Sequence, residues 1–263
     1  MRESSERFIN FSPALCDTMI VRFLFVDDQQ LSQLAAVALL QQLGHEADAV
    51  SSGMAAIAAV RSKAYDIIVL DLEMPTLDGY QTARMLRSMT RGGAQLRIVA
   101  LTAHDGQSIA ESCARAGIDA SVQKPLQRTS VGVLLGGAAS LRVQDEVAVL
   151  DAGVIRELSD LRDDAGRSML PDLVERYVAE LPGRLQLMSE SFARGDLDAL
   201  RRHAHSLRST SLTLGALEVS RVAQPLEASK GLVSERFTEH MSALASATTR
   251  AAERLQHCVT AMA

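Results

Sequence analysis

The sequence predicts a chain of two parts, an α/β part with a doubly wound, five-stranded parallel sheet and an all-α part that forms an antiparallel helical bundle. As far as residue 136, short apolar runs alternate with amphipathic stretches, which is the pattern of successive strand–helix units. From residue 151 onward the helical pattern continues and no strand pattern remains. Strand–helix units in sequence predict a parallel sheet covered by helices on both faces, with right-handed crossovers.

The composition narrows the classes of function. With 263 residues, 47% of them hydrophobic, the chain is long enough for two domains with cores of their own. A net charge of −5 argues against nucleic acid as a partner, because duplex binding needs a basic surface. Three widely separated cysteines indicate a reducing compartment and no zinc site, and no apolar run reaches the ~20 residues of a membrane span. We therefore expect a cytoplasmic protein.

Four segments are expected along the chain. Residues 1–20 contain charges and a proline that interrupt any signal-peptide core, so we expect a poorly ordered leader, with Met19 as an alternative start. The α/β part is assigned to residues 21–136. The glycine- and alanine-rich residues 137–150 lose the helical period and are assigned to a linker. The helical bundle is assigned to residues 151–263.

Each element of the α/β part has a local signal. Apolar runs predict strands at residues 21–26, 47–50, 67–70, 96–101 and 118–122. Helical spacing predicts helices at residues 31–43, 53–63, 79–89 and 107–116, with a weak one ending near 135. Gly44 and Gly117 are placed where glycine commonly ends a helix.

Polar side chains follow four of the five predicted strands. The strand at 67–70 delivers Asp71 to its carboxyl end, and a proline-containing loop follows at once. The other groups are Asp27 and Asp28 after the first strand, Thr102 after the fourth and Lys124 after the fifth. Taken singly, each is equally a turn, N-cap or surface residue. Together they meet at one edge of a parallel sheet, where open α/β sheets bind their ligands.

This set of residues suits phosphoryl transfer to a carboxylate. Oxygen ligands from Asp28, Asp71 and the backbone carbonyl of Glu73 would bind a hard cation such as Mg²⁺. That cation would neutralise charge on a phosphoryl group moving to Asp71. Lys124 and the Thr102 hydroxyl would hold the remaining phosphoryl oxygens.

At these residues the chain resembles a response-regulator receiver domain, over residues 21–136. The matching features are Asp27-Asp28, Asp71, Met74-Pro75, Asp78-Gly79, Thr102 and Lys124-Pro125. The resemblance implies phosphorylation of Asp71, Mg²⁺ at Asp27, Asp28 and Asp71, and switching through Thr102. It also implies the flavodoxin-like strand order 2-1-3-4-5. Ser121 departs from the family, because it stands where many receivers carry an aromatic residue.

The second half contains one informative helix. Helices are predicted at residues 151–161, 170–194 with a kink at Pro182, 198–215, 217–228 and 235–260. On a helical wheel His203 lies at the edge of the apolar stripe and is expected to be structural, whereas His205 points away from it, toward solvent. The helical neighbours of His205 are Arg201, Arg202, Arg208 and Ser209. We expect a neutral nucleophile whose phosphorylated form gains charge-assisted hydrogen bonds, although an incidental surface histidine is the plain alternative.

Residues 151–263 resemble a histidine-containing phosphotransfer (HPt) domain. The matching stretches are Ala204 to Ser209 and Leu214-Gly215-Ala216. The family has a lysine three residues after the histidine and a glycine four residues after it. Arg208 replaces the lysine and keeps its charge, and Ser209 replaces the glycine.

The two resemblances together imply a phosphorelay protein without a kinase domain, and not an enzyme with turnover. Asp71 would receive phosphoryl from an upstream hybrid histidine kinase, and His205 would exchange it with Asp71 or with the receiver of a separate response regulator. One alternative is an adaptor in which His205 is inert and the bundle only docks partners. Another is a Mg²⁺-dependent phosphohydrolase, which is disfavoured because Glu73 stands where such enzymes need a second aspartate.

Overall fold

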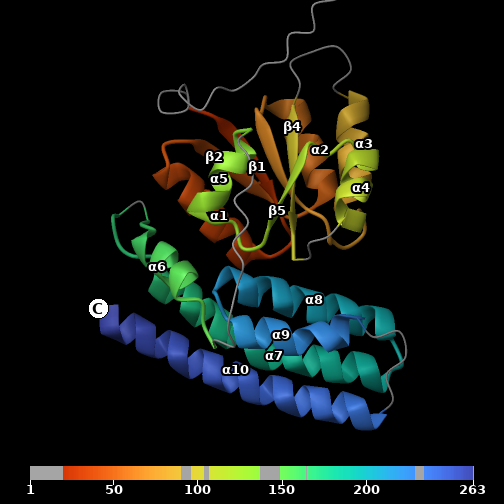
Figure 1. Cartoon of the computed structure of the whole chain (residues 1–263), viewed down its shortest axis with the longest axis vertical. Helices are drawn as coiled ribbons and strands as arrows, with labels where there is room; N and C mark the ends of the chain where they lie inside the picture. The colour runs from red at the N-terminus through yellow and green to blue at the C-terminus, as the bar shows by residue number, and fades with distance from the viewer. Residues whose placement is uncertain are drawn as a thin grey trace, which may run out of the picture.

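The computed structural model describes residues 20–89, 96–103, 107–136, 149–163, 165–228 and 234–262. In these residues an α/β part lies against a helical bundle (Figure 1). The predicted leader and most of the predicted linker lie outside the described residues. Among the described helices, none is long and apolar enough to cross a lipid bilayer.

The sheet has the predicted strands and order. Its strands are β1 (Arg22–Val26), β2 (Glu46–Val50), β3 (Ile67–Asp71), β4 (Arg97–Thr102) and β5 (Ala120–Gln123). They pair in parallel in the order β2-β1-β3-β4-β5, which confirms the order that the resemblance implied. Every residue of β3 is buried, as expected for a central strand covered on both faces.

Helices cover both faces of the sheet. They are α1 (Gln30–Gln42), α2 (Gly53–Ser62), α3 (Gly79–Met89), α4 (Gln107–Ala116) and α5 (Val131–Leu134). Residues of α1 and α5 pack on one face of the sheet and residues of α2, α3 and α4 on the other. Gly44 and Gly117 have φ of +84° and +77°, which explains why glycine ends α1 and α4.

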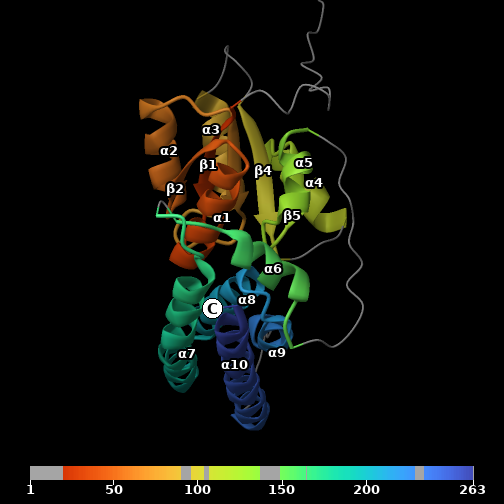
Figure 2. The ribbon, with the colours of Figure 1, turned by 90° about the vertical axis from the view of Figure 1, so that its left-hand side faces the viewer.

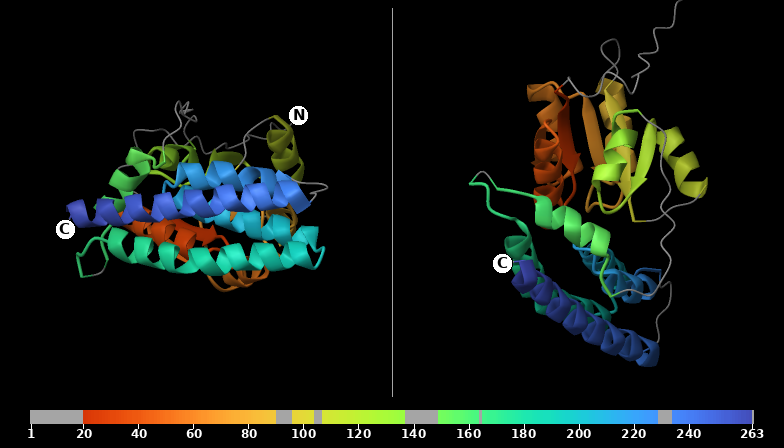
Figure 3. Two further views of the ribbon diagram at one scale, coloured as in Figure 1. Left: turned by 90° about the horizontal axis from the view of Figure 1, so that it is seen from below. Right: turned by 60° about the vertical axis from the view of Figure 1, so that its left-hand side comes forward.

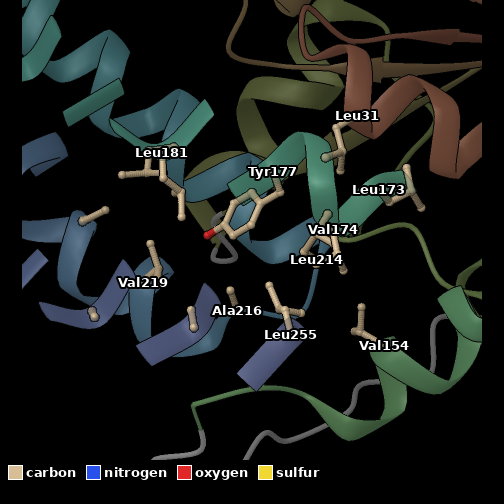
Figure 4. Packing of buried hydrophobic residues seen from close by; sticks show 14 of the residues in the cluster. Leu31, Val154, Leu173, Val174, Tyr177, Leu181, Leu214, Ala216, Val219 and Leu255 are labelled. Atoms are coloured by element: carbon tan, nitrogen blue, oxygen red, sulfur yellow. The ribbon is translucent and has the colours of Figure 1, made fainter. Parts of the chain in front are cut away.

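The second half is a helical bundle around an apolar core. Its helices are α6 (Ala152–Asp160), α7 (Leu170–Ala193), α8 (Leu197–Thr213), α9 (Leu217–Ala228) and α10 (Ser234–Met262). The long helices α7 and α10 lie side by side along its length (Figure 3). The assigned helix α7 is continuous through Pro182, where the sequence predicted a kink. Tyr177 is fully buried at the centre of the core, and its hydroxyl lies 2.8 Å from Ser211 Oγ (Figure 4).

The two parts share one packed interface. Leu31, Ala35, Ala38 and Leu39 of α1 belong to the same buried cluster as the core of the bundle, and Leu31 is seen pointing into it in Figure 4. Figures 1 and 2 both place α8 next to the carboxyl edge of the sheet. The edge that carries the predicted site therefore faces the helix that carries His205.

Candidate functional site

Three carboxylates gather at the edge between the neighbouring strands β1 and β3. Side-chain oxygens of Asp27, Asp28 and Asp71 lie within 4.8 Å of one another. Asp27 is fully buried and Asp71 is 2% exposed. The strand pairing explains the cluster, because Val26 and Leu70 are partners in the β1–β3 register and each is followed by an aspartate.

Lys124 partly neutralises this cluster. Its Nζ lies 2.8 Å from Asp71 Oδ2 and 3.1 Å from Asp27 Oδ2, and the lysine is buried. Burial opposes the charge on Lys124, but the two carboxylates outweigh it and raise the lysine pKa. The backbone N–H of Lys124 donates to the carbonyl of Thr102 at 2.7 Å, so the pairing of β4 with β5 brings both residues to the same edge.

One lysine cannot balance the charge of three ionised carboxylates, so the cluster can bind a cation. Burial raises the pKa of Asp27 to about 6, and Asp71 adds to this effect while Lys124 opposes it. Burial also raises the pKa of Asp28. Buried carboxylates that resist ionisation gain most from a hard divalent cation, so the donor set fits Mg²⁺. Glu73 follows Asp71 by two residues, and its backbone N–H donates to Asp71 Oδ1 at 3.2 Å.

The prediction that His205 points to solvent is wrong. His205 is only 9% exposed, because the face of α8 that turns away from the bundle core is covered by the α/β part. Its Nδ1 lies 2.7 Å from Glu227 Oε1 in α9 and 2.9 Å from Glu73 Oε2, which belongs to the α/β part. Its Nε2 is buried and has no hydrogen-bond partner among the described residues. His203 is half-buried on the same helix.

The charge environment of His205 also differs from the prediction of a neutral ring surrounded by arginines. Burial lowers the pKa of His205, but its hydrogen bonds to Glu227 and Glu73 outweigh burial and raise this pKa to about 9. Arg208 shares the Glu227 carboxylate with His205. It donates to Glu227 at 3.0 Å and to the carbonyl of Ala103, in the α/β part, at 2.9 Å.

Several contacts at this interface were not predicted from the sequence. Glu227 lies 22 residues beyond His205 in the next helix, and no local pattern marks it. Gln29 follows the acidic pair directly and accepts hydrogen bonds from the bundle. Ser209 was noted as a departure from the HPt pattern, and its Oγ accepts a hydrogen bond from Lys124 Nζ at 2.6 Å.

Each part of the chain matches a known family model. Residues 23–133 match the family model of the response regulator receiver domain, and residues 172–262 match that of the Hpt domain.

Sensor and sensory/regulatory proteins are among the similar sequences. The sensor protein GacS of Pseudomonas syringae pv. syringae is 30% identical over 219 residues, which cover 78% of this chain and 24% of GacS. The sensory/regulatory protein RpfC of Xanthomonas campestris pv. campestris is 26% identical over 216 residues, which cover 76% of this chain and 29% of RpfC. The chain thus spans about a quarter of the length of these relatives.

A solved structure similar to the first half is the receiver domain of the sensor histidine kinase PA1611 from Pseudomonas aeruginosa PAO1, determined with a magnesium ion coordinated in its active site cleft. It is 32% identical, covers 44% of this chain and 95% of that chain, and has a TM-score of 0.40.

Proposed function

Because this chain joins a receiver domain to an Hpt domain, we propose that it is a phosphorelay intermediate in which Asp71 and His205 carry the same phosphoryl group in turn. One observation carries the proposal: both residues lie at the same buried junction. Lys124 contacts Asp71 on one side and Ser209, one helical turn from His205, on the other. Glu73, two residues after Asp71, contacts His205 directly.

The receiver half supplies an acceptor and the groups that position the donor. Asp27, Asp28, Asp71 and the backbone carbonyl of Glu73 would hold Mg²⁺, which when bound neutralises charge on the phosphoryl oxygens. An oxygen of Asp71 attacks the phosphorus of the donor, the phosphohistidine of an upstream hybrid histidine kinase. The O–P bond forms, the P–N bond breaks, and its electron pair returns to the donor imidazole. Lys124 and the Thr102 hydroxyl hold the phosphoryl oxygens during this step.

The bundle supplies the second acceptor. Glu227 accepts a hydrogen bond from His205 Nδ1–H, which leaves Nε2 as the nucleophilic nitrogen. Arg208 lies near enough to compensate phosphoryl charge, since it bridges Glu227 and the α/β part. Because the pKa of His205 is about 9, the ring must first lose its Nε2 proton at neutral pH.

The chain therefore acts as a phosphoacceptor and carrier between partners. We expect it to act in the cytoplasm, between an upstream histidine kinase and the receiver domain of a downstream response regulator.

Labelling with a small acyl phosphate tests this function. In the presence of Mg²⁺, the wild-type chain should take up both base-labile acyl phosphate on Asp71 and base-stable phosphoramidate on His205. Asp71→Asn should abolish both forms of label, and His205→Gln should abolish only the base-stable form. His203→Gln, on the same helix, is the matched control and should label like the wild type. Full labelling of Asp71→Asn would exclude Asp71 as the acceptor.

A further inference from the structure

Four hydroxyl side chains form a row along one face of α8. The row consists of Ser206, Ser209, Thr210 and Thr213, and we call it the hydroxyl row. Spacings of three, four and seven residues place these side chains on one face of a helix. Ser209, Thr210 and Thr213 are buried, and Ser206 is half-buried. Buried hydroxyl groups destabilise a protein unless they find hydrogen-bond partners, so the partners of this row are informative.

Gln29 of the receiver is the main partner of the hydroxyl row. Its Oε1 accepts from the Ser206 hydroxyl at 3.0 Å and lies 3.3 Å from the Thr210 hydroxyl. The same oxygen accepts from Arg184 Nη2 of α7 at 3.0 Å. Gln29 is itself buried, and its backbone N–H donates to Asp27 Oδ1 at 2.8 Å. One receiver residue thus joins the acidic site to two helices of the bundle.

The other two hydroxyl groups also contact the receiver. Lys124 Nζ donates to Ser209 Oγ at 2.6 Å, and Thr213 Oγ1 lies 3.1 Å from Ser32 Oγ of α1. Every member of the hydroxyl row therefore lies within hydrogen-bonding distance of a receiver side chain. A glycine in place of Ser209 would remove one of these contacts.

We propose that Gln29 and the hydroxyl row select the receiver of the same chain as the transfer partner of His205. This inference rests on the proposed function and adds the identity of the partner. A receiver without an amide oxygen at this position would leave the Ser206 hydroxyl without its acceptor. It would also remove one contact each from Arg184, which keeps Glu180, and from Thr210, which keeps the Ser206 carbonyl. A site built to form hydrogen bonds rejects a partner that lacks the matching group.

The exchange in this docked pair is balanced without a further reactant. The Nε2 lone pair of His205 attacks the phosphorus carried by Asp71, the P–N bond forms, and the bond from phosphorus to the Asp71 oxygen breaks. The electron pair of that bond returns to the Asp71 carboxylate. The Nδ1 proton stays on the ring and is shared with Glu227, which stabilises the positive charge of the phosphorylated imidazole.

The first experiment measures transfer within the full chain. After labelling with a small acyl phosphate and Mg²⁺, base-labile label on Asp71 and base-stable label on His205 are followed separately. The rate constant for conversion of one into the other should not change with chain concentration.

Gln29→Ala should lower this rate constant by about tenfold or more, because the hydrogen bonds between Gln29 and the bundle are lost. Ser206→Ala combined with Thr210→Val should act in the same direction from the bundle side, away from the acidic site. Gln41→Ala is the matched control, because Gln41 lies at an exposed position of α1, the helix that begins directly after Gln29.

The second experiment measures transfer between chains. A labelled His205→Gln chain is the donor and an Asp71→Asn chain is the acceptor. Gln29→Ala in the acceptor should speed transfer, because its own receiver covers His205 less firmly, whereas Gln29→Ala in the donor should slow it. In the first experiment, a rate constant that rises in proportion to the wild-type concentration would overturn the inference. In the second, equal effects of Gln29→Ala in donor and acceptor would overturn it. Absence of label on Asp71 in every chain would instead overturn the proposed function.

Discussion

Asp27 is fully buried beside a second carboxylate, with one lysine shared between them. This arrangement leaves negative charge in a place that water cannot reach, and it explains why the pKa of Asp27 rises to about 6. The same residue is a candidate ligand for Mg²⁺. Protons and the cation should therefore compete for it.

We expect Mg²⁺ affinity to fall as the pH is lowered through 6. A raised carboxyl pKa means that the proton binds Asp27 more tightly in the folded protein, so below about pH 6 the cation must displace it. The loss should approach about tenfold per pH unit at most for one proton displaced. Calorimetric titration with Mg²⁺ between pH 7 and pH 5 measures it. Asp27→Asn should bind more weakly at pH 7 and depend less on pH, whereas a constant wild-type affinity over this range would contradict the assignment.

Glu227 should control the protonation of His205. Because the Glu227 hydrogen bond is the largest influence raising the His205 pKa against burial, Glu227→Gln should lower this pKa from about 9 toward its usual range. An NMR titration of the His205 ring measures the change. Glu218→Gln, which alters a carboxylate of the same helix that is paired with Arg250, is the control. An unchanged pKa in Glu227→Gln would show that the contact with Glu73 alone is sufficient.

The loop from β3 to α3 holds Asp71 through a close backbone contact. The N–H of Gly79 donates to the carbonyl of Leu72 at 3.0 Å, so the start of α3 lies against the end of β3. A Cβ at position 79 would lie 2.3 Å from the Asp71 carbonyl oxygen and 2.7 Å from Leu72 Cα. No side chain can be accommodated there without moving the backbone that carries the acceptor.

Gly79→Ala should therefore both destabilise the protein and impair phosphorylation of Asp71. We expect the free energy of unfolding to fall by about 2 kcal/mol, as is typical when a group is forced into a packed site. Chemical denaturation and labelling with an acyl phosphate measure the two effects. Gly132→Ala is the matched control, because a Cβ in that helix meets open space, and it should change the stability by less than about 1 kcal/mol. Equal stability of the two variants would contradict the steric argument.

The two domains pack as one unit through α1. Its apolar side chains join the core cluster of the bundle, and its N-terminal end lies beside the acidic site and Gln29. The interface thus combines apolar burial, which supplies stability, with buried hydrogen bonds, which supply specificity. Both acceptors of the proposed relay are enclosed by this interface.

Ala35→Glu should separate the domains. Ala35 is 7% exposed and lies in the cluster shared with the bundle, so a carboxylate there would be buried without a partner. Small-angle scattering should show a larger radius of gyration, and amide exchange in α8 should become faster. Gln41→Glu adds the same charge at an exposed position of α1 and should leave both measurements unchanged. Unaltered scattering by Ala35→Glu would show that α1 does not hold the domains together.

The sequence alone determined the strands and helices and the set of residues at the sheet edge. Buried strands, helix-ending glycines and strand-end carboxylates are local signals, since they depend on neighbours within a few residues. That is why the positions of Asp27, Asp28, Asp71 and Lys124 could be predicted together.

Only the tertiary structure decided the surroundings of His205. A helical wheel separates the face toward the bundle core from the opposite face, and it correctly kept His205 off the core stripe. It cannot show that a second domain covers the opposite face, nor that Glu227, Glu73 and Gln29 meet there. These contacts join residues far apart in the chain, and packing between domains, unlike helical period, leaves no regular spacing in the sequence.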